Sequence, residues 1–134
     1  MKNDKLLHLP KNKIKTMTKE EFSEIIERNP ELTTHGYGIQ RDPYLGSTYR
    51  ETFDNMREEL KKSYEAFLAC LAWIDENPDF ERGWSSYALK HEVENWTERH
   101  GKRLYVPQGG FIIACLFRGL PLKRIPNDLG VFVE

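Results

Sequence analysis

Residues 85–120, SSYALKHEVENWTERHGKRLYVPQGGFIIACLFRGL, decide the predicted fold. Ser85 or Ser86 can cap a helix that ends at Gly101, because serine accepts from the first amides and glycine tolerates the left-handed conformation after a helix. Pro107 suits the first turn of a second helix. Residues 111–117, FIIACLF, are apolar on every side, so we expect this second helix to be the buried centre of the domain.

Two more helices are predicted upstream. Thr18 and Thr48 each precede a glutamate by three residues, which is the spacing of a capping box. The first helix should end at Asn29-Pro30. The second is predicted as one long helix over 48–76, because its apolar residues recur every three or four positions. They are Tyr49, Phe53, Met56, Leu60, Tyr64, Phe67, Leu71 and Ile74. Its last turns are apolar nearly all round, which predicts burial on several sides or a homo-oligomer through this helix.

The remaining segments complete the predicted architecture. Glycine and Asp-Pro turn signals make residues 31–46 a loop. Residues 122–133, LKRIPNDLGVFV, predict a β-hairpin. The fold class is therefore mainly α, a compact four-helix domain over 17–134 with a C-terminal hairpin, preceded by a flexible basic arm over 1–16. The order helix, turn, helix, hairpin resembles a winged helix–turn–helix.

The net charge of −1 is unevenly distributed. Residues 1–19 sum to +5, residues 20–83 to −8 and residues 84–134 to +2. The basic arm is either a solvated end or an electrostatic tether to phosphates or an acidic partner. No signal peptide and no membrane-spanning run is recognised, and Cys70 and Cys115 sit in apolar patterns, so we expect a cytoplasmic protein that binds no membrane.

The candidate catalytic residues all have structural interpretations. The histidines, at positions 8, 35, 91 and 100, lack the spacing of metal ligands. Both cysteines lie on apolar faces, where a thiol is inert. Glu92, Glu94 and Glu98 are assigned to the solvated face of a helix. We therefore expect no enzyme, no metal and no cofactor.

Two motifs carry a resemblance. Ser85-Ser86-Tyr87-Ala88-Leu89-Lys90-His91, followed by Tyr105-Val106-Pro107-Gln108-Gly109-Gly110-Phe111-Ile112, resembles a segment of small uncharacterised proteins from bacterial plasmids and phages. Those proteins carry Gly, Asn and Ala where this chain has Ala88, Gln108 and Gly110. The resemblance covers the last third to two fifths of the chain and implies a mobile-element origin without implying an activity.

Binding is the predicted function. The leading hypothesis is a phage or plasmid accessory protein that binds a host protein or protein–nucleic-acid complex. The candidate partner is a host defence nuclease complex of the CRISPR or restriction type, inhibited by occlusion. We expect the interface at polar and aromatic positions, namely Tyr37, Arg41, Tyr44, Arg57, Glu58 and Lys61.

The alternative hypothesis is a nucleic-acid-binding regulator that contacts phosphates through the basic linker, the hairpin and the Lys-rich arm. Its candidate residues are Arg99, Lys102, Arg103, Arg118, Lys123 and Arg124. The apolar composition of residues 111–117 counts against this hypothesis, because a recognition helix needs polar side chains facing the groove.

Overall fold

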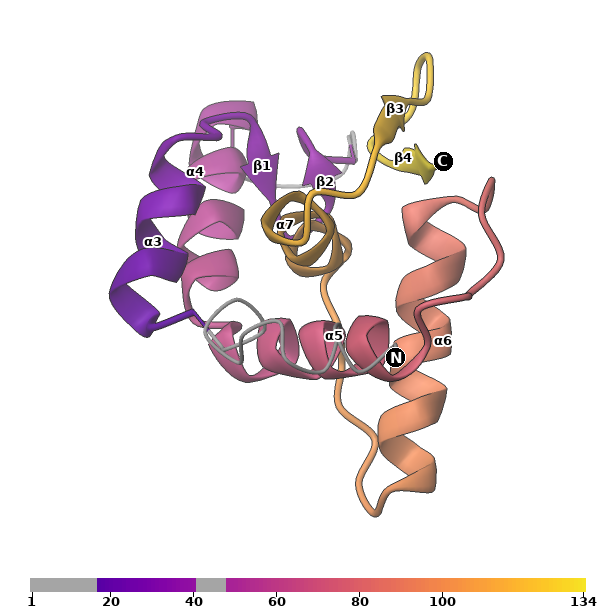
Figure 1. The fold of residues 1–134 in the computed structure, drawn as a ribbon. Coiled ribbons are helices and arrows are strands. Elements are labelled where there is room, and N and C mark those ends of the chain that lie inside the picture. Colours follow the sequence, from indigo (N-terminus) through magenta and orange to yellow (C-terminus); the bar gives the residue numbers. More distant parts are fainter. Residues whose placement is uncertain (1–16, 41–47) are drawn as a thin grey trace.

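Helix α7 (Gln108–Phe117) runs through the centre of the fold. Figure 1 looks along its axis and shows α4 (Tyr49–Lys61), α5 (Tyr64–Glu76) and α6 (Ser86–Arg99) on three sides of it. Two small hairpins lie on the remaining side. Residues Phe111 to Cys115 are all fully buried. The prediction of a buried central helix is therefore confirmed.

The computed structural model describes residues 17–40 and 48–134. The described residues form five helices and two antiparallel two-stranded sheets. The elements not yet named are α3 (Lys19–Glu27), β1 (Leu32–Thr33), β2 (Gly36–Tyr37), β3 (Leu122–Arg124) and β4 (Val131–Val133). The predicted basic arm over 1–16 lies outside the described residues. Within them, no helix combines the length and the apolar character needed to cross a membrane.

The predicted long helix over 48–76 is two helices, so the expected count of four becomes five. The break falls at Lys62-Ser63, where Ser63 donates its hydroxyl to the Leu60 carbonyl at 2.6 Å. A serine hydroxyl that bonds to the backbone in this way competes with the helical ladder. Figure 1 shows the consequence: α4 stands beside α7, and α5 turns to pass beneath it.

The break also changes how the recurring apolar residues of 48–76 are buried. The second half of this series is buried inside the same chain, against α7 and α6, through residues that include Phe67, Cys70, Leu71, Trp73 and Ile74. The apolar surface that led to the prediction of a homo-oligomer is thus largely buried within one chain.

The helix starts follow the sequence closely. Thr18 and Thr48 each form a complete capping box with the glutamate three residues later. The Ser85 hydroxyl accepts from the Ala88 amide at 3.1 Å and begins α6. Gly101, beyond the end of α6, has a φ of 125°, as a glycine after a helix commonly does.

The segment predicted as a plain loop contains the β1–β2 hairpin, which packs on the start of α7. Gly109 makes this contact possible. A Cβ atom added there would lie 1.9 Å from the Thr33 carbonyl oxygen, and the Gly109 amide donates to the Thr34 carbonyl at 3.3 Å. Glycine at this position therefore lets α7 approach the backbone of β1 directly.

The predicted C-terminal hairpin is present as β3 and β4. Strand β4 lies against the start of α6, where Ser85 forms a bridge with Phe132. A winged helix–turn–helix exposes its second helix to DNA. The corresponding helix here, α7, is buried, so the chain differs from that motif at this point.

Candidate functional site

A cleft of about 1280 Å³ lies at the start of α6. Its walls come from α6, from the link that leads into α7, from the end of the β1–β2 hairpin and from the β3–β4 turn. The polar and aromatic residues in its described lining include His35, Tyr87, Lys90, Tyr105, Gln108, Arg124 and Asp128. We refer to this site as the tyrosine cleft.

Two exposed tyrosines stand at the tyrosine cleft with a lysine between them. Tyr87 is 58% exposed and Tyr105 is 67% exposed, the two highest values among the large hydrophobic side chains described. The Lys90 ammonium lies 5.7 Å from the Tyr87 ring centre and 4.9 Å from that of Tyr105. Its side chain is only 8% exposed. The site thus combines aromatic surface with a nearly buried positive charge.

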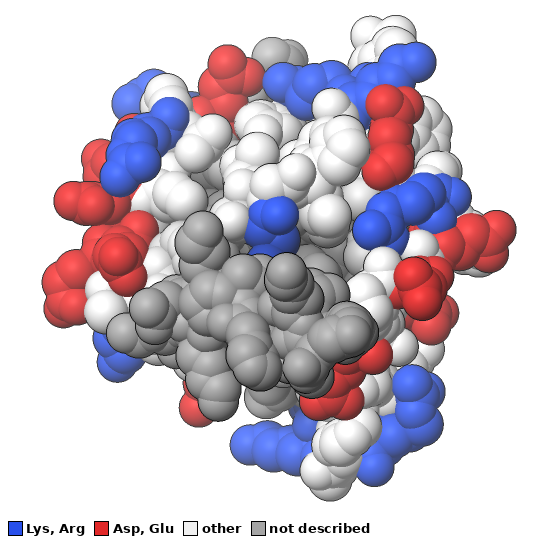
Figure 2. All heavy atoms as spheres, in the orientation of Figure 1, with Lys and Arg blue, Asp and Glu red and all other residues white. Residues whose placement is uncertain are grey.

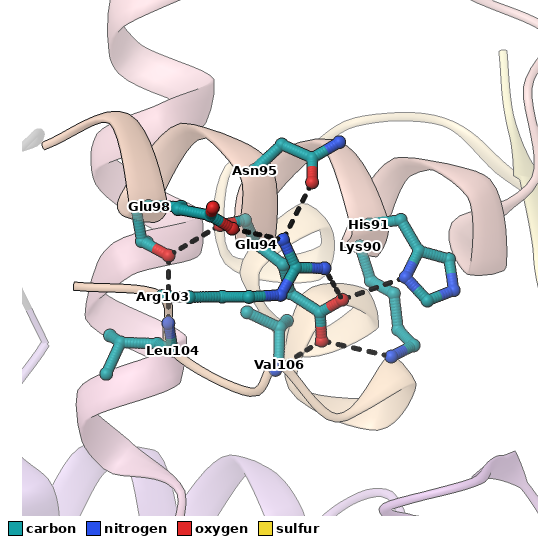
Figure 3. A network of polar contacts seen from close by, with 9 residues as sticks. Lys90, His91, Glu94, Asn95, Glu98, Arg103, Leu104 and Val106 are labelled. Carbon is teal, nitrogen blue, oxygen red and sulfur yellow. Dashed lines mark hydrogen bonds and ion pairs between the residues drawn. The ribbon is translucent and has the colours of Figure 1, made fainter. Parts of the chain in front are cut away.

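Glu94 holds this lysine in place from beneath (Figure 3). One carboxylate oxygen accepts from Lys90 Nζ at 3.2 Å and from the Val106 amide at 2.8 Å. The other lies 2.8 Å from His91 Nδ1 and 3.3 Å from Arg103 Nη2. Burial acts to raise the pKa of Glu94, but these hydrogen bonds and charges outweigh burial and lower it. Glu94 is therefore a charged, fully coordinated carboxylate inside the protein.

The same network fixes the link that carries Tyr105. Arg103 bonds to Asn95 at 2.8 Å and to Glu98 at 3.0 Å, so three residues of α6 hold its guanidinium (Figure 3). The Thr97 hydroxyl accepts from the Leu104 amide at 3.0 Å. Since the residues on both sides of Tyr105 are bound to α6, its ring is presented from a rigid support.

The floor of the cleft is a second polar cluster. Gln108, on α7, accepts from the Ser86 hydroxyl at 2.8 Å and donates to the His35 carbonyl at 2.7 Å. The Ser86 hydroxyl also accepts from the Val131 amide at 3.0 Å. Gly130 leaves room for this cluster, because a Cβ atom there would lie 2.4 Å from the Gln108 side chain. Four parts of the fold therefore meet at one buried serine and one buried glutamine.

His35 lies at the edge of the cleft as a neutral side chain. Burial lowers the pKa of His35. Its Nδ1 accepts a hydrogen bond from the Gln40 amide at 3.0 Å, which requires that nitrogen to be unprotonated. His35 therefore adds hydrogen-bonding capacity to the cleft without adding charge.

A second, smaller cleft of about 450 Å³ adjoins the first. Both are lined by Thr34, His35 and Tyr105, so these residues form the boundary between them. The charged residues of the second cleft are Glu59, Lys62 and Glu65. We refer to the two adjoining clefts together as the groove, with Tyr105 at their shared edge.

The residues predicted for protein interaction do not gather at this groove. Arg57 donates to the carbonyls of Ile26, Asn29 and Leu32 at 2.8–3.0 Å and so closes the end of α3. Lys61 lies 2.7 Å from Glu27 and 3.4 Å from Glu58 and ties the same two helices together. The Tyr37 ring is partly covered by Arg124, 4.2 Å from its centre. Glu58 is exposed, and Arg41 and Tyr44 lie outside the described residues.

Half of the residues predicted for nucleic-acid binding are engaged within the protein. Arg103 serves the Glu94 network, Arg118 forms a two-pronged ion pair with Asp75, and Arg124 lies on Tyr37 with Glu31 at 3.7 Å. Arg103 and Arg124 nevertheless remain 45% and 54% exposed, and the other three residues, Arg99, Lys102 and Lys123, are exposed as well.

The six cationic residues also fail to form one patch. Figure 1 shows the α6–α7 link and the β3–β4 hairpin at opposite ends of α6. Arg99 ends α6 and Lys102 lies in the link, whereas Lys123 lies in β3 of the hairpin. On the face shown in Figure 2, basic and acidic side chains alternate around the edge.

The site residues that sequence reasoning missed lie on α6 and in the α6–α7 link. Lys90 and Glu94 were assigned to a solvated face, and the structure buries both, with exposures of 6% and 4%. The available signal was spacing. Buried residues on α6 recur every three or four positions when polar ones are included: Ser86, Leu89, Lys90, Val93, Glu94 and Thr97. No spacing pattern in the sequence indicated that Tyr87 and Tyr105 would be exposed, because the exposure of a tyrosine depends on the assembled fold.

Other chemistry is limited in the described part of the chain. No group of three or more His, Cys, Asp or Glu side chains in residues 17–40 and 48–134 is arranged to hold a metal ion. Cys70 and Cys115 are fully buried. Burial raises the pKa of Cys115 to about 12 and that of Cys70 well above 9.0.

Comparison with known proteins adds no assignment to this geometry. The chain matches no protein-family model, and no curated protein and no solved structure matches it significantly.

Proposed function

We propose that this protein acts without catalysis, by binding a host macromolecule at the tyrosine cleft. In its fuller form the proposal is a phage or plasmid accessory protein that binds a host protein or protein–nucleic-acid complex. A defence nuclease complex of the CRISPR or restriction type is the candidate target, and occlusion is the mechanism. The motifs that resemble mobile-element proteins contribute five residues of the cleft, Ser85, Tyr87, Lys90, Tyr105 and Gln108.

One observation carries the binding proposal: Tyr87 and Tyr105 remain mostly exposed on a rigid support beside a concave site. Tyrosines are enriched among the residues that dominate binding energy, because a ring offers large contact area with few rotatable bonds. The polar network beneath them holds the link in place before binding, so little conformational entropy is lost in the complex.

The non-catalytic part of the proposal follows from how the reactive groups are held. The carboxylate of Glu94 is occupied by four donors or charges and cannot approach a substrate without leaving them. The two thiols are buried and protonated at neutral pH, which removes them as nucleophiles. His35 Nδ1 already accepts the Gln40 amide.

Nucleic-acid binding has weaker support. The helix expected to read DNA is buried, and three of the six expected cations serve internal contacts. Among the residues that the structure describes, the exposed predicted cations are divided between the end of α6 with its link to α7 and the β3–β4 hairpin. These two places lie at opposite ends of α6, so the described cations do not form a continuous track along a phosphate backbone.

Affinity capture from host lysate, with and without nuclease treatment, tests the proposal. The tagged full chain should retain a defined host protein after nuclease treatment, identified by mass spectrometry. A variant with Tyr87→Ala and Tyr105→Ala should lose it. Tyr49→Ala is the matched control, because Tyr49 is 47% exposed and does not appear in the cleft lining.

The outcomes separate clearly. Capture that survives the double substitution would place the interface elsewhere and contradict the proposal. Capture that disappears with nuclease, together with direct binding to DNA or RNA that weakens steeply with salt, would favour the alternative function.

A further inference from the structure

The Lys90 ammonium has unused hydrogen-bonding capacity at the tyrosine cleft. Among the described residues, Glu94 is its one hydrogen-bond acceptor, at 3.2 Å. A lysine ammonium carries three N–H donors, so two remain for a ligand or water. The Lys90 side chain is only 8% exposed, and it lines the cleft. A nearly buried cation with spare donors favours an anionic acceptor in the cleft.

The charges around the cleft point in the same direction. Its described lining contains two cations, Lys90 and Arg124, and one carboxylate, Asp128. His35 contributes no charge, because burial lowers its pKa. Below the lining, Arg103 adds one positive charge and Glu94 and Glu98 add two negative ones, so the excess of positive charge is confined to the lining itself. An acidic ligand is the electrostatic complement of this surface.

The shape of the groove favours an extended chain over a small anion. The two clefts meet at Thr34, His35 and Tyr105, so a ligand that enters the larger one can continue across the Tyr105 ring into the smaller one. An extended peptide advances about 3.3 Å per residue, which lets several residues contact both tyrosines. The second cleft is mildly acidic, with Glu59 and Glu65 against Lys62, so the acidic end of the peptide belongs at Lys90.

We infer that the tyrosine cleft binds an extended acidic segment of a partner protein, with one Asp or Glu carboxylate hydrogen-bonded to Lys90 Nζ. The residues next to that carboxylate pack on the rings of Tyr87 and Tyr105. The inference rests on the proposed function and specifies its ligand.

A displayed library of random peptides of about ten residues, selected on the full-length protein, tests the inference. We expect the selected peptides to be enriched in Asp and Glu and to require Tyr105. Replacing the key glutamate of a selected peptide by glutamine should weaken binding about tenfold, because a charge-assisted hydrogen bond is lost. This substitution is made in the peptide, so the protein fold is unaffected.

Two protein variants then locate the carboxylate. Lys90→Met removes the cation in the cleft, and Glu94 keeps Arg103 and the Val106 amide. Arg103→Met is the matched control, because it removes a cation from the same carboxylate but does not appear in the cleft lining. The glutamate-to-glutamine change should weaken binding about tenfold for the wild type and for Arg103→Met, and less than about twofold for Lys90→Met.

Several results would overturn the inference. Tyr105-dependent peptides without acidic enrichment would do so. A glutamate-to-glutamine effect of equal size in Lys90→Met and Arg103→Met would also do so, and both results leave the proposed function standing. Failure to select any Tyr105-dependent peptide would refute the peptide ligand, whereas the proposed function is decided separately by host-protein capture. An oligothymidine of about fifteen nucleotides that binds in a Lys90-dependent manner would replace the peptide by single-stranded nucleic acid.

Discussion

Helices α6 and α7 are both deeply buried on at least one face, but the buried side chains of α7 are apolar and those of α6 include polar and charged groups. From Phe111 to Cys115, α7 presents only apolar side chains to its neighbours. The buried face of α6 alternates apolar residues with Ser86, Lys90, Glu94 and Thr97. Apolar burial is non-directional, so α7 supplies cohesion, whereas hydrogen bonds have direction, so α6 can hold other segments in defined positions.

This difference assigns separate tasks to the two helices. The polar residues of α6 bind the α6–α7 link and strand β4, and the exposed tyrosines stand beside those contacts. Nothing in α7 beyond Gln108 takes part in the cleft. Substitutions in α7 should therefore change stability alone, and substitutions in α6 should change both stability and binding.

The largest effect is expected at the start of α7, where Gly109→Ala should destabilise the protein by about 3 kcal/mol. The new Cβ would lie 1.9 Å from the Thr33 carbonyl oxygen, so α7 and β1 must separate. Gly110→Ala is the control, because its nearest atoms are 3.8 Å away. It should leave stability unchanged or raise it by up to about 1 kcal/mol through helix propensity. Denaturant unfolding measures both, and equal losses would contradict the described packing.

On α6, Glu94→Gln should cost about 3 kcal/mol, because Lys90 and Arg103 would face a neutral group inside the protein. Glu98→Gln, one turn away, removes a 62% exposed carboxylate that also binds Arg103. Its cost should stay below about 0.5 kcal/mol. Chemical denaturation distinguishes the two, and a Glu94→Gln variant as stable as the wild type would show that the network adds no stability.

A smaller effect should appear as pH dependence. The pKa of Glu94 is lower in the folded protein than its ordinary value of 4.5, so its stabilising contribution is present above that value. It is lost as pH falls through the folded pKa. The stability difference between wild type and Glu94→Gln should therefore shrink at acidic pH below about 4.5. The lowered pKa values of Glu27 and Glu51 occur in both proteins and cancel. A difference that is constant with pH would refute the charged state of Glu94.

The smallest expected effect is the absence of thiol reactivity. Cys115 on α7 and Cys70 on α5 are fully buried, and burial raises both pKa values. A thiol-specific reagent at pH 8 should leave the native protein unmodified and label both cysteines after unfolding. Mass spectrometry of the labelled protein measures this, and rapid labelling of the native state would mean that the centre of the fold opens readily.

Local signals predicted the ends of most helices and the C-terminal hairpin. The capping boxes at Thr18 and Thr48, the serine cap at Ser85 and the glycine at Gly101 all act through neighbours within a few residues. The break at Ser63 was missed, since the apolar spacing continues through it without interruption. The hydrogen bond from the Ser63 hydroxyl to the Leu60 carbonyl marks the break only in the folded chain.

The candidate site was predicted least well. Lys90, Glu94 and Arg103 resemble surface residues in any one-dimensional pattern, and an amphipathic helix normally exposes such charges. Burial of Lys90 and Glu94, and the ion pair with the half-exposed Arg103, require His91 and the α6–α7 link with Val106 to meet at one carboxylate. The same is true of Ser86 and Gln108, which meet across 22 positions of sequence.

The sequence by itself determined that the apolar segment 111–117 lies at the centre of the domain, because a segment apolar on all sides has no stable position in water. Phe111 to Cys115 are fully buried there, and Leu116 and Phe117 are half-buried. It also determined where most helices begin, through caps that need no distant partner. The tertiary structure alone decided which charges are internal and which tyrosines are exposed. Burial of a polar group is stable only when distant donors and acceptors converge on it, and that convergence is a property of the assembled fold.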